Sequence, residues 1–259
     1  MTAADPKFEI RLAHHESDFL AAQRLRYNVF VTELGGDGDL VDHEARLERD
    51  IFDPYYDHLV LIDHSRNADD LDHVVGVYRL MRSDQADKIG NFYCESEYDL
   101  SPLKAKGRKL LELGRSCLHA DYRGGMAMFH LWNALATYVL EHDVEILFGV
   151  ASFHGINVDA IKEPLSFLYH THLAPPDLRV RVLKKHYQNM NLLPLDQIDR
   201  REAMVATPAL IKAYLRLGGL VGDGAFVDIK FNTTDVFMLM DTNRMNENQR
   251  RRIVEGRKA

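Results

Sequence analysis

The sequence predicts an α/β fold in which helices flank a mixed central β-sheet. Strand-like and helix-like segments alternate along most of the chain, and two early strand-like segments lie close enough together to form a hairpin. The chain has 259 residues, of which 46% are hydrophobic and 27% are charged. This composition is that of a globular protein, so collagen-like, coiled-coil and wholly disordered classes are excluded.

The N-terminal part of the chain supplies a strand, a helix and the hairpin. Residues 8–12 alternate apolar and polar side chains, as a half-buried strand does. Ser17 offers the N-cap of an amphipathic helix that ends near Phe30. Residues 58–63 and 73–81 are expected to be the two hairpin strands, separated by a polar loop.

The rest of the chain continues the alternation. A strand is expected over residues 110–119, a long helix over 128–140 and a buried strand over 145–151. The remaining expected elements are a helix around 157–169, a short segment at 180–183, a helix over 208–217 and a final strand over 236–240. No repeat or linker interrupts this pattern. We therefore expect one domain over residues 1–241, followed by a basic helix or tail over 242–259.

Charge, cysteine content and hydropathy restrict the class of protein. The formal net charge of -7 argues against nucleic acid as the main partner. Two cysteines are too few for a disulfide framework and indicate a reducing compartment. The first twenty residues contain no signal-like apolar stretch, and the most apolar helical run, residues 126–140, is too short to span a bilayer. We expect a cytoplasmic protein.

The charge is unevenly distributed along the chain. Residues 36–72 are rich in Asp and Glu, whereas residues 242–259 carry six Arg or Lys against two Glu. Two basic clusters lie between these segments: Lys104, Lys106, Arg108 and Lys109, and then Arg179, Arg181, Lys184 and Lys185. Such clusters are most often solvated faces, but a free positive surface would suit an acidic partner.

A glycine-rich turn separates the strand 110–119 from the long helix. Arg123, Gly124 and Gly125 stand just before the helix N-terminus, where free backbone N–H groups and the helix dipole favour an anion such as phosphate. The alternative is a tight strand-to-helix turn without a ligand.

Several short motifs in this order resemble those of one family. Residues 112–115 (ELGR) and 121–125 (DYRGG) are similar to the central strand and phosphate turn of GNAT-type N-acyltransferases. The branch they resemble includes acyl-homoserine-lactone synthases and the bacterial L-ornithine N-acyltransferases. Its other motifs match residues 26–30 (RYNVF), 48–53 (ERDIFD) and 75–80 (VGVYRL).

The C-terminal half resembles the ornithine acyltransferases more than the lactone synthases. The matching segments are residues 151–155 (ASFHG), 173–179 (LAPPDLR) and 214–218 (YLRLG), so the resemblance covers roughly residues 8–241. It implies a GNAT-like fold and transfer of a 3-hydroxyacyl chain from acyl carrier protein to the α-amino group of L-ornithine. The product would be lyso-ornithine lipid, in the first step of ornithine lipid biosynthesis.

One departure from the wider superfamily bears on the acyl donor. Met126 and Met128 follow the glycine turn at positions where coenzyme A-binding relatives have small residues. Larger side chains would crowd a pyrophosphate that needs close approach to the backbone. The single phosphate of a carrier-bound phosphopantetheine suits this turn better, so we expect no dissociable cofactor.

The reaction needs a base for the acceptor amine and a polarised thioester carbonyl. Glu112 lies in an otherwise apolar strand and is the candidate general base; with Arg115 it forms the predicted catalytic pair. The alternative is a buried glutamate neutralised by Arg115 or Arg79. A backbone N–H near residues 116–118 would polarise the carbonyl, as in an oxyanion hole.

A second set of charged residues suits an amino acid substrate. Arg26 and Arg79 could hold an α-carboxylate, and Asp50 and Asp53 could hold the δ-ammonium group of ornithine. The alternative is an ion-pair network that ties the N-terminal helix to the sheet.

Two histidine-containing pairs raise the alternatives of a thiol nucleophile and a metal site. Cys117 and His119 are two residues apart on a strand, which is the spacing of a thiol nucleophile beside a base, but a core cysteine beside a polar neighbour is the commoner arrangement. His170 and His172 have no further ligand at metal-binding spacing, so we predict no metal.

The expected partners follow from the chemistry and the charge distribution. An acidic acyl carrier protein could dock on a basic cluster, and the basic C-terminal segment could contact anionic lipid at the inner face of the cytoplasmic membrane. Two other functions remain open: an acyl-homoserine-lactone synthase, and a non-catalytic module that binds an acyl carrier or a membrane.

Overall fold

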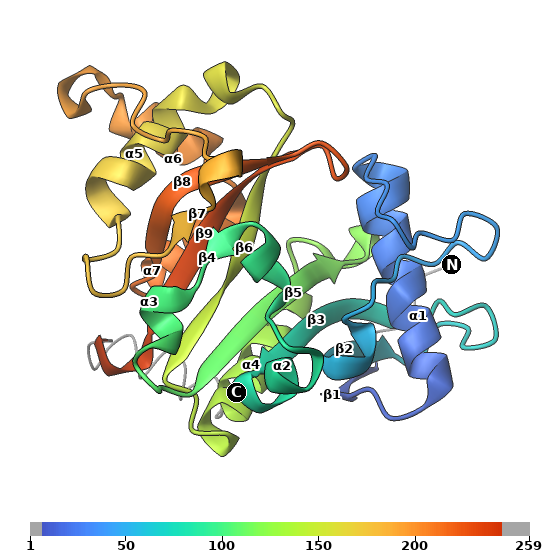
Figure 1. Ribbon diagram of the computed structural model, residues 1–259. Coiled ribbons are helices and arrows are strands. Elements are labelled where there is room, and N and C mark those ends of the chain that lie inside the picture. The colour runs from blue at the N-terminus through green and yellow to red at the C-terminus, as the bar shows by residue number, and fades with distance from the viewer. Residues whose placement is uncertain (1–6, 245–259) are drawn as a thin grey trace. The chain divides into compact units, whose positions relative to one another are not determined.

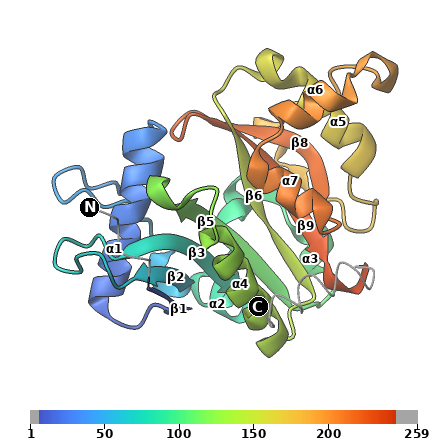
Figure 2. The same cartoon turned by 180° about the vertical axis from the view of Figure 1, so that it is seen from behind.

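The computed structural model describes residues 7–244, which form two compact units (Figures 1 and 2). Within this range, unit 1 comprises residues 7–90 and 113–143, and unit 2 comprises residues 91–112 and 144–244. The described residues include nine strands and seven α-helices. The single-domain expectation stays a prediction, and the expected basic tail lies outside the described residues after Arg244.

Unit 1 is built on strands that are hydrogen-bonded in the order β1-β2-β3-β5. Their bounds are Phe8–Leu12 for β1, Asp57–Asp63 for β2, Val74–Arg82 for β3 and Leu110–Leu118 for β5, whose first three residues belong to unit 2. The predicted hairpin is confirmed, because β2 and β3 pair antiparallel with Leu59 opposite Tyr78. Strand β1 extends the sheet on the other side of β2, also antiparallel.

Helices cover both faces of this sheet. On one face lies α1 (Glu16–Arg26), and on the other lies α4 (Ala127–Glu141); α2 (Ser83–Ile89) follows β3 (Figures 1 and 2). Adjacent residues of β3 show the alternation: Val77 packs in the core cluster of α1, whereas a Cβ on Gly76 would lie 2.9 Å from Leu131 of α4. Gly76 therefore permits α4 to approach the sheet closely.

The first helix differs from its prediction at both ends. Its N-cap is His15 rather than Ser17, because the carboxylate of Asp18 accepts the amides of His14 and His15 and fixes the entry earlier. The helix leaves α geometry at Arg26 and continues as a π-helical turn, Tyr27–Glu33. The prediction of one continuous helix to Phe30 was wrong, because the last part of this segment is π-helical.

Unit 2 contains a mixed set of strands in the order β6-β9-β8-β7-β4. Their bounds are Ile146–His154 for β6, Thr233–Asp241 for β9, Leu220–Asp228 for β8, Arg181–Val182 for β7 and Tyr98–Asp99 for β4. Pairing is antiparallel except between β7 and β8, which run parallel.

The described part of unit 2 has four α-helices, and the two over residues 101–104 and 200–206 were not predicted. Their bounds are Ser101–Lys104 for α3, Lys162–His172 for α5, Arg200–Ala206 for α6 and Ala209–Arg216 for α7. The expected helix around 157–169 starts later, because residues 158–161 form a 3₁₀ turn. Among residues 7–244, no helix combines the length and the hydropathy needed to cross a bilayer.

Candidate active site

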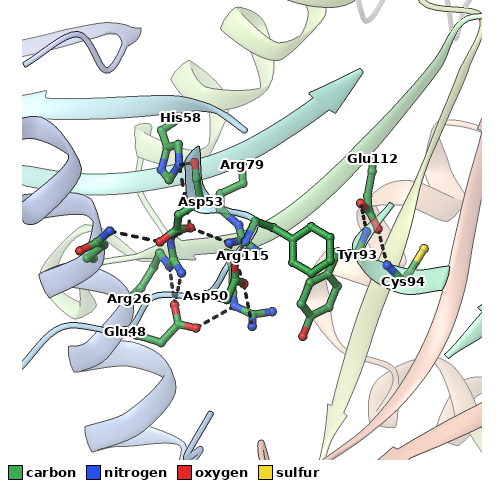
Figure 3. A network of polar contacts seen from close by, with 12 residues as sticks. Arg26, Glu48, Asp50, Asp53, His58, Arg79, Tyr93, Cys94, Glu112 and Arg115 are labelled. Carbon is green, nitrogen blue, oxygen red and sulfur yellow. Dashed lines mark hydrogen bonds and ion pairs between the residues drawn. The ribbon is translucent and has the colours of Figure 1, made fainter. Parts of the chain in front are cut away.

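A ring of six charged side chains lies in unit 1 (Figure 3). Its members are Arg26, Glu48, Asp50, Asp53, Arg79 and Arg115. They come from the end of α1, the loop before β2, and strands β3 and β5. Five of the six are residues for which the sequence predicted a catalytic or binding role, and the structure brings these five together.

Arginine and carboxylate alternate along one side of the ring. Arg26 contacts Glu48, and its Nη1 lies 2.7 Å from Oδ1 of Asp53. The same oxygen of Asp53 lies 2.6 Å from Nη1 of Arg79. Arg26 and Arg79 are fully buried, so each needs these carboxylates to offset the loss of water.

Arg115 closes the ring on the other side. Its Nε lies 3.1 Å from Oε1 of Glu48, and its Nη2 lies 3.6 Å from Oδ2 of Asp50. Asp50 also lies 2.8 Å from Nη1 of Arg79. Three positive and three negative side chains therefore balance, and the side chains of Asp50 and Arg115, 17% and 13% exposed, are the most accessible of the six.

The arginines determine the ionisation of the carboxyl groups. Burial raises the pKa of Glu48, but Arg26 and Arg115 outweigh it and hold the pKa at about 2. Asp53 behaves in the same way: Arg26 and Arg79 overcome burial and lower its pKa to about 2. Both carboxyl groups are therefore ionised at neutral pH.

Polar and aromatic neighbours hold the ring in place. Gln23 donates from Nε2 to Asp53 at 3.1 Å, and Nε2 of His58 lies 3.1 Å from the carbonyl oxygen of Asp53. Burial lowers the pKa of His58 to about 4, so this imidazole is neutral at pH 7. The guanidinium of Arg79 lies 4.3 Å from the ring centroid of Tyr56, a cation–π contact.

The backbone of β5 is irregular where it meets the ring. Arg115 has φ of 49°, an uncommon value for a residue with a side chain. A Cβ on Gly114 would lie 3.8 Å from Nη2 of Arg79, while Arg115 itself reaches Glu48 and Asp50. Two consecutive residues therefore face the same side, as they do at a β-bulge.

Glu112 has its own set of partners in unit 2. Its side chain is buried, and its two oxygens accept the backbone amides of Tyr93 and Cys94, each at 2.9 Å (Figure 3). These amides belong to the 3₁₀ turn Tyr93–Ser96. The carboxylate is thus oriented by backbone donors, and its predicted role as a base stays a prediction.

The glycine-rich turn lies before α4, as expected. Gly124 has φ of 77°, which favours glycine, and no heavy atom lies within 4 Å of the position of an added Cβ. Among residues 7–244, the amides of Gly124, Gly125 and Met126 have no hydrogen-bond partner. Arg123, predicted as part of this anion site, forms two hydrogen bonds with Glu33 and lowers the pKa of the Glu33 carboxyl group.

The cysteine and histidine pairs show other surroundings. Cys117 packs in the core cluster of α1, and burial raises the pKa of its thiol to about 12. Such a thiol is protonated at neutral pH and is a poor nucleophile. His170 donates from Nε2 to the carbonyl oxygen of Leu193, and no group of three metal-ligating side chains occurs within residues 7–244.

One ring member, Glu48, and one ring neighbour, His58, were not predicted as site residues from the sequence. Glu48 appeared only as part of a motif, although its position two residues before Asp50 was a usable signal. Nothing in the sequence indicated His58, which reaches Asp53 only through the fold.

The fold and the matched domain define the class. The acetyltransferase (GNAT) domain family matches residues 25–133. A CoA-dependent acyl-homoserine lactone synthase, BjaI, has the same fold, with a TM-score of 0.53 at 14% identity over 96% of this chain and 89% of that chain. The chain therefore has the GNAT fold.

The curated relatives identify the family within this class. The chain is 62% identical to an L-ornithine N(alpha)-acyltransferase of Rhodobacter capsulatus over 260 residues, which cover 99% of this chain and all of the relative. It is 40% identical over 240 residues to the enzyme of the same description from Brucella abortus, covering 92% of this chain and 85% of the relative. The chain belongs to the L-ornithine N(alpha)-acyltransferase family, and the resemblance seen in its motifs is confirmed.

Proposed function

We propose that this enzyme transfers a 3-hydroxyacyl chain from acyl carrier protein to the α-amino group of L-ornithine, forming lyso-ornithine lipid. This is the first step of ornithine lipid biosynthesis. The observation that carries the acceptor and the reaction is the 62% identity to an L-ornithine N(alpha)-acyltransferase over the full length of both chains. The donor and the residue roles rest on the structural arguments that follow.

The acceptor site is proposed at the accessible edge of the charged ring. Ornithine carries a carboxylate and two amino groups, so it requires a positive and a negative side chain near each other. Arg115 and Asp50 are such a pair and are the least buried members of the ring. Arg115 would hold the α-carboxylate, a binding role in place of the catalytic one first expected of it, and Asp50 would hold the δ-ammonium group.

The remaining ring residues would position that pair. Arg26, Arg79 and Asp53 are buried and are engaged on more than one side. Asp50 and Arg115 also form ion pairs, but the side chains of these three residues are at most 9% exposed and offer a substrate less access. We therefore assign them to holding Asp50 and Arg115 in place, which narrows the binding role first expected of them.

The chemical step needs a proton acceptor and a polarised carbonyl. Glu112 would take a proton from the α-ammonium group, directly or through water. The free amine then attacks the thioester carbon, and a backbone N–H of residues 116–118 stabilises the oxyanion. The carbon–sulfur bond breaks, the thiol leaves with a proton, and the amide remains.

The turn before α4 supports a carrier-bound donor. Its amides, those of Gly124, Gly125 and Met126, are available to one phosphate. Met126 follows at once with a 56% exposed side chain, in the place where a pyrophosphate would need open backbone. Phosphopantetheine on acyl carrier protein has one phosphate and no nucleotide, so it needs fewer free backbone amides at this turn than coenzyme A does.

The product also suggests where the enzyme works. Lyso-ornithine lipid has a polar head and a long acyl chain, so it partitions into a membrane. We place the reaction in the cytoplasm, with peripheral contact at the inner face of the cytoplasmic membrane.

Product analysis tests the proposed function. The protein is incubated with 3-hydroxyacyl carrier protein and, in separate reactions, ornithine, glutamine or S-adenosylmethionine, and the products are identified by mass. We expect an amide of ornithine. A lactone formed from S-adenosylmethionine would identify a lactone synthase. A product formed with glutamine but not with ornithine would show that glutamine is the acceptor. Carrier binding without turnover would indicate a non-catalytic module.

A further inference from the structure

The two basic clusters of unit 2 differ in how far their charge is neutralised. In the first cluster, the cations form ion pairs with carboxylates. Nζ of Lys104 lies 2.9 Å from a carboxylate oxygen of Glu95, and Nζ of Lys106 lies 3.3 Å from one of Asp177. Arg108 is bound by Asp241 at 2.6 Å. This cluster is an ion-paired surface and offers little net positive charge to a partner.

The second cluster retains uncompensated charge. Lys184 and Lys185 are exposed, and neither has a hydrogen bond or an ion pair with any of residues 7–244. Arg181, three residues earlier, has a 61% exposed side chain that pairs with Asp223 and stacks on Tyr187. We call Arg181, Lys184 and Lys185 the β7 basic surface.

The backbone beneath the β7 basic surface is held on both sides of the two lysines. The amide of Leu183 donates to the carbonyl oxygen of Glu97 at 2.8 Å, just before Lys184. After Lys185, the ring of His186 packs edge-on against Phe226 with centroids 5.1 Å apart. The lysines are therefore presented from a fixed turn, and binding a partner would order only their side chains.

We propose that the β7 basic surface is the docking site for the acidic face of the acyl carrier protein, an inference that rests on the donor assigned above. The chain as a whole carries a net charge of -7, so an acidic partner is repelled by most of the molecule and attracted where cations are free. Lys184 and Lys185 lose no existing ion pair when such a partner binds.

A protein partner fits this surface better than a bilayer. Peripheral membrane contact combines basic side chains with apolar ones that enter the interface. The large hydrophobic side chains exposed within residues 7–244 include none between Arg179 and Tyr187. Its exposed members are cations, which suits long-range steering of a charged protein.

The test compares two double variants that remove the same charge. Lys184→Ala/Lys185→Ala removes free cations, whereas Lys104→Ala/Lys106→Ala removes paired ones, so long-range effects are matched. We expect the first variant to lose about tenfold in kcat/KM for 3-hydroxyacyl carrier protein, mainly through KM, and to bind holo-carrier about tenfold more weakly. The second variant should stay within about twofold of wild type. Thermal unfolding of each variant checks that it is folded.

Each alternative result identifies what has failed. Equal losses in both variants, or no loss in either, would overturn the β7 basic surface while leaving the donor intact. Unchanged carrier binding together with lost binding to vesicles containing anionic lipid would assign the surface to the membrane. A wild-type enzyme that uses acyl-coenzyme A but not acyl carrier protein would overturn the proposed donor itself.

Discussion

At the scale of single residues, each charged side chain of the ring is paired with a side chain of opposite charge. Arg26 is fully buried at the end of α1 and pairs with both Glu48 and Asp53. Removing one member of such a group leaves its partners desolvated and uncompensated, which costs more than the intact pair contributes. The ring therefore makes the fold of unit 1 sensitive to single substitutions.

This sensitivity gives a stability prediction. Arg26→Met should lower the free energy of unfolding by about 3–5 kcal/mol, because Glu48 and Asp53 lose a buried counter-charge. Arg49→Met is the matched control, since Arg49 pairs with Asp42 at the surface and should contribute at most about 1 kcal/mol. Urea denaturation measures both, and equal effects would show that the ring carries no special role in folding.

The second residue-scale prediction concerns Glu112. Replacing it with Gln should lower kcat by about 10²–10⁴-fold with little change in KM, because the proposed base is lost while the proposed acceptor site is kept. Glu95→Gln is a suitable control, since Glu95 caps the same 3₁₀ turn by accepting the amide of Phe92 at 2.7 Å. Full activity in Glu112→Ala would exclude the base and leave only a structural role.

At the scale of elements, close packing between α4 and β3 depends on Gly76. An added Cβ there would lie 2.8 Å from Leu118 and 2.9 Å from Leu131, so both leucines would have to move. At Gly114 an added Cβ would make only ordinary contacts, the nearest at 3.7 Å from Tyr56. The two glycines share one sheet but have different steric requirements.

The corresponding prediction compares alanine at the two positions. Gly76→Ala should lower stability by about 1–3 kcal/mol through overpacking, whereas Gly114→Ala should change it by about 0.5 kcal/mol or less. Thermal unfolding of the two variants measures this difference. An unchanged midpoint for Gly76→Ala would mean that α4 can shift away from β3 without cost.

The elements also show why the sequence predicted some of the fold and missed the rest. The hairpin β2–β3 and helix α4 have long apolar patterns, which local sequence reveals. Strand β8 was missed because Gly222, Asp223 and Gly224 look like a loop; in the structure they are the irregularity between Val221 and Ala225. Its main partner, β9, follows directly after residues 229–232, so the irregularity rather than distance along the chain hid this strand.

The candidate site divides in the same way. Arg26, Asp50, Asp53 and Arg79 were proposed together because of their charge and their motifs, and the structure brings them together. The occupation of Arg123 by Glu33 was not predicted, because it joins residues ninety positions apart. Ion pairs between distant loops depend on tertiary geometry rather than on spacing.

At the scale of the whole molecule, buried ionisable groups predict how stability depends on pH. His58 has a pKa of about 4 in the folded protein against an ordinary value of 6.5, so the unfolded chain binds its proton first. Its contribution is complete above pH 6.5 and is lost as the pH falls toward 4. Glu48 and Asp53, with lowered pKa values of about 2, lose their contributions below about pH 4.5.

Two phases of acid destabilisation should therefore appear. The free energy of unfolding should fall by on the order of 3 kcal/mol between pH 6.5 and 4 because of His58, and then further at lower pH. His58→Gln, which keeps a donor for the carbonyl of Asp53, should weaken the first phase and leave the second. Identical pH profiles for the variant and the wild type would contradict this assignment.

The whole-molecule charge of -7 combines surfaces of opposite character. The ring is neutral overall, the cluster near Lys104 is neutralised, and the β7 basic surface keeps free positive charge. A net charge alone indicated neither an amino acid site nor a place for an acidic protein. Resolved by residue, it supports the proposal that the enzyme binds a charged amino acid and receives its acyl chain from an acidic carrier protein.

The most direct test uses 3-hydroxyacyl carrier protein as the only acyl donor and ornithine carrying ¹⁵N at either the α or the δ position. Tandem mass spectrometry of the product shows which nitrogen forms the amide. The proposed reaction predicts an amide at the α-nitrogen with carrier protein alone. An amide at the δ-nitrogen, or product formation only when the acyl chain is supplied on coenzyme A, would contradict it.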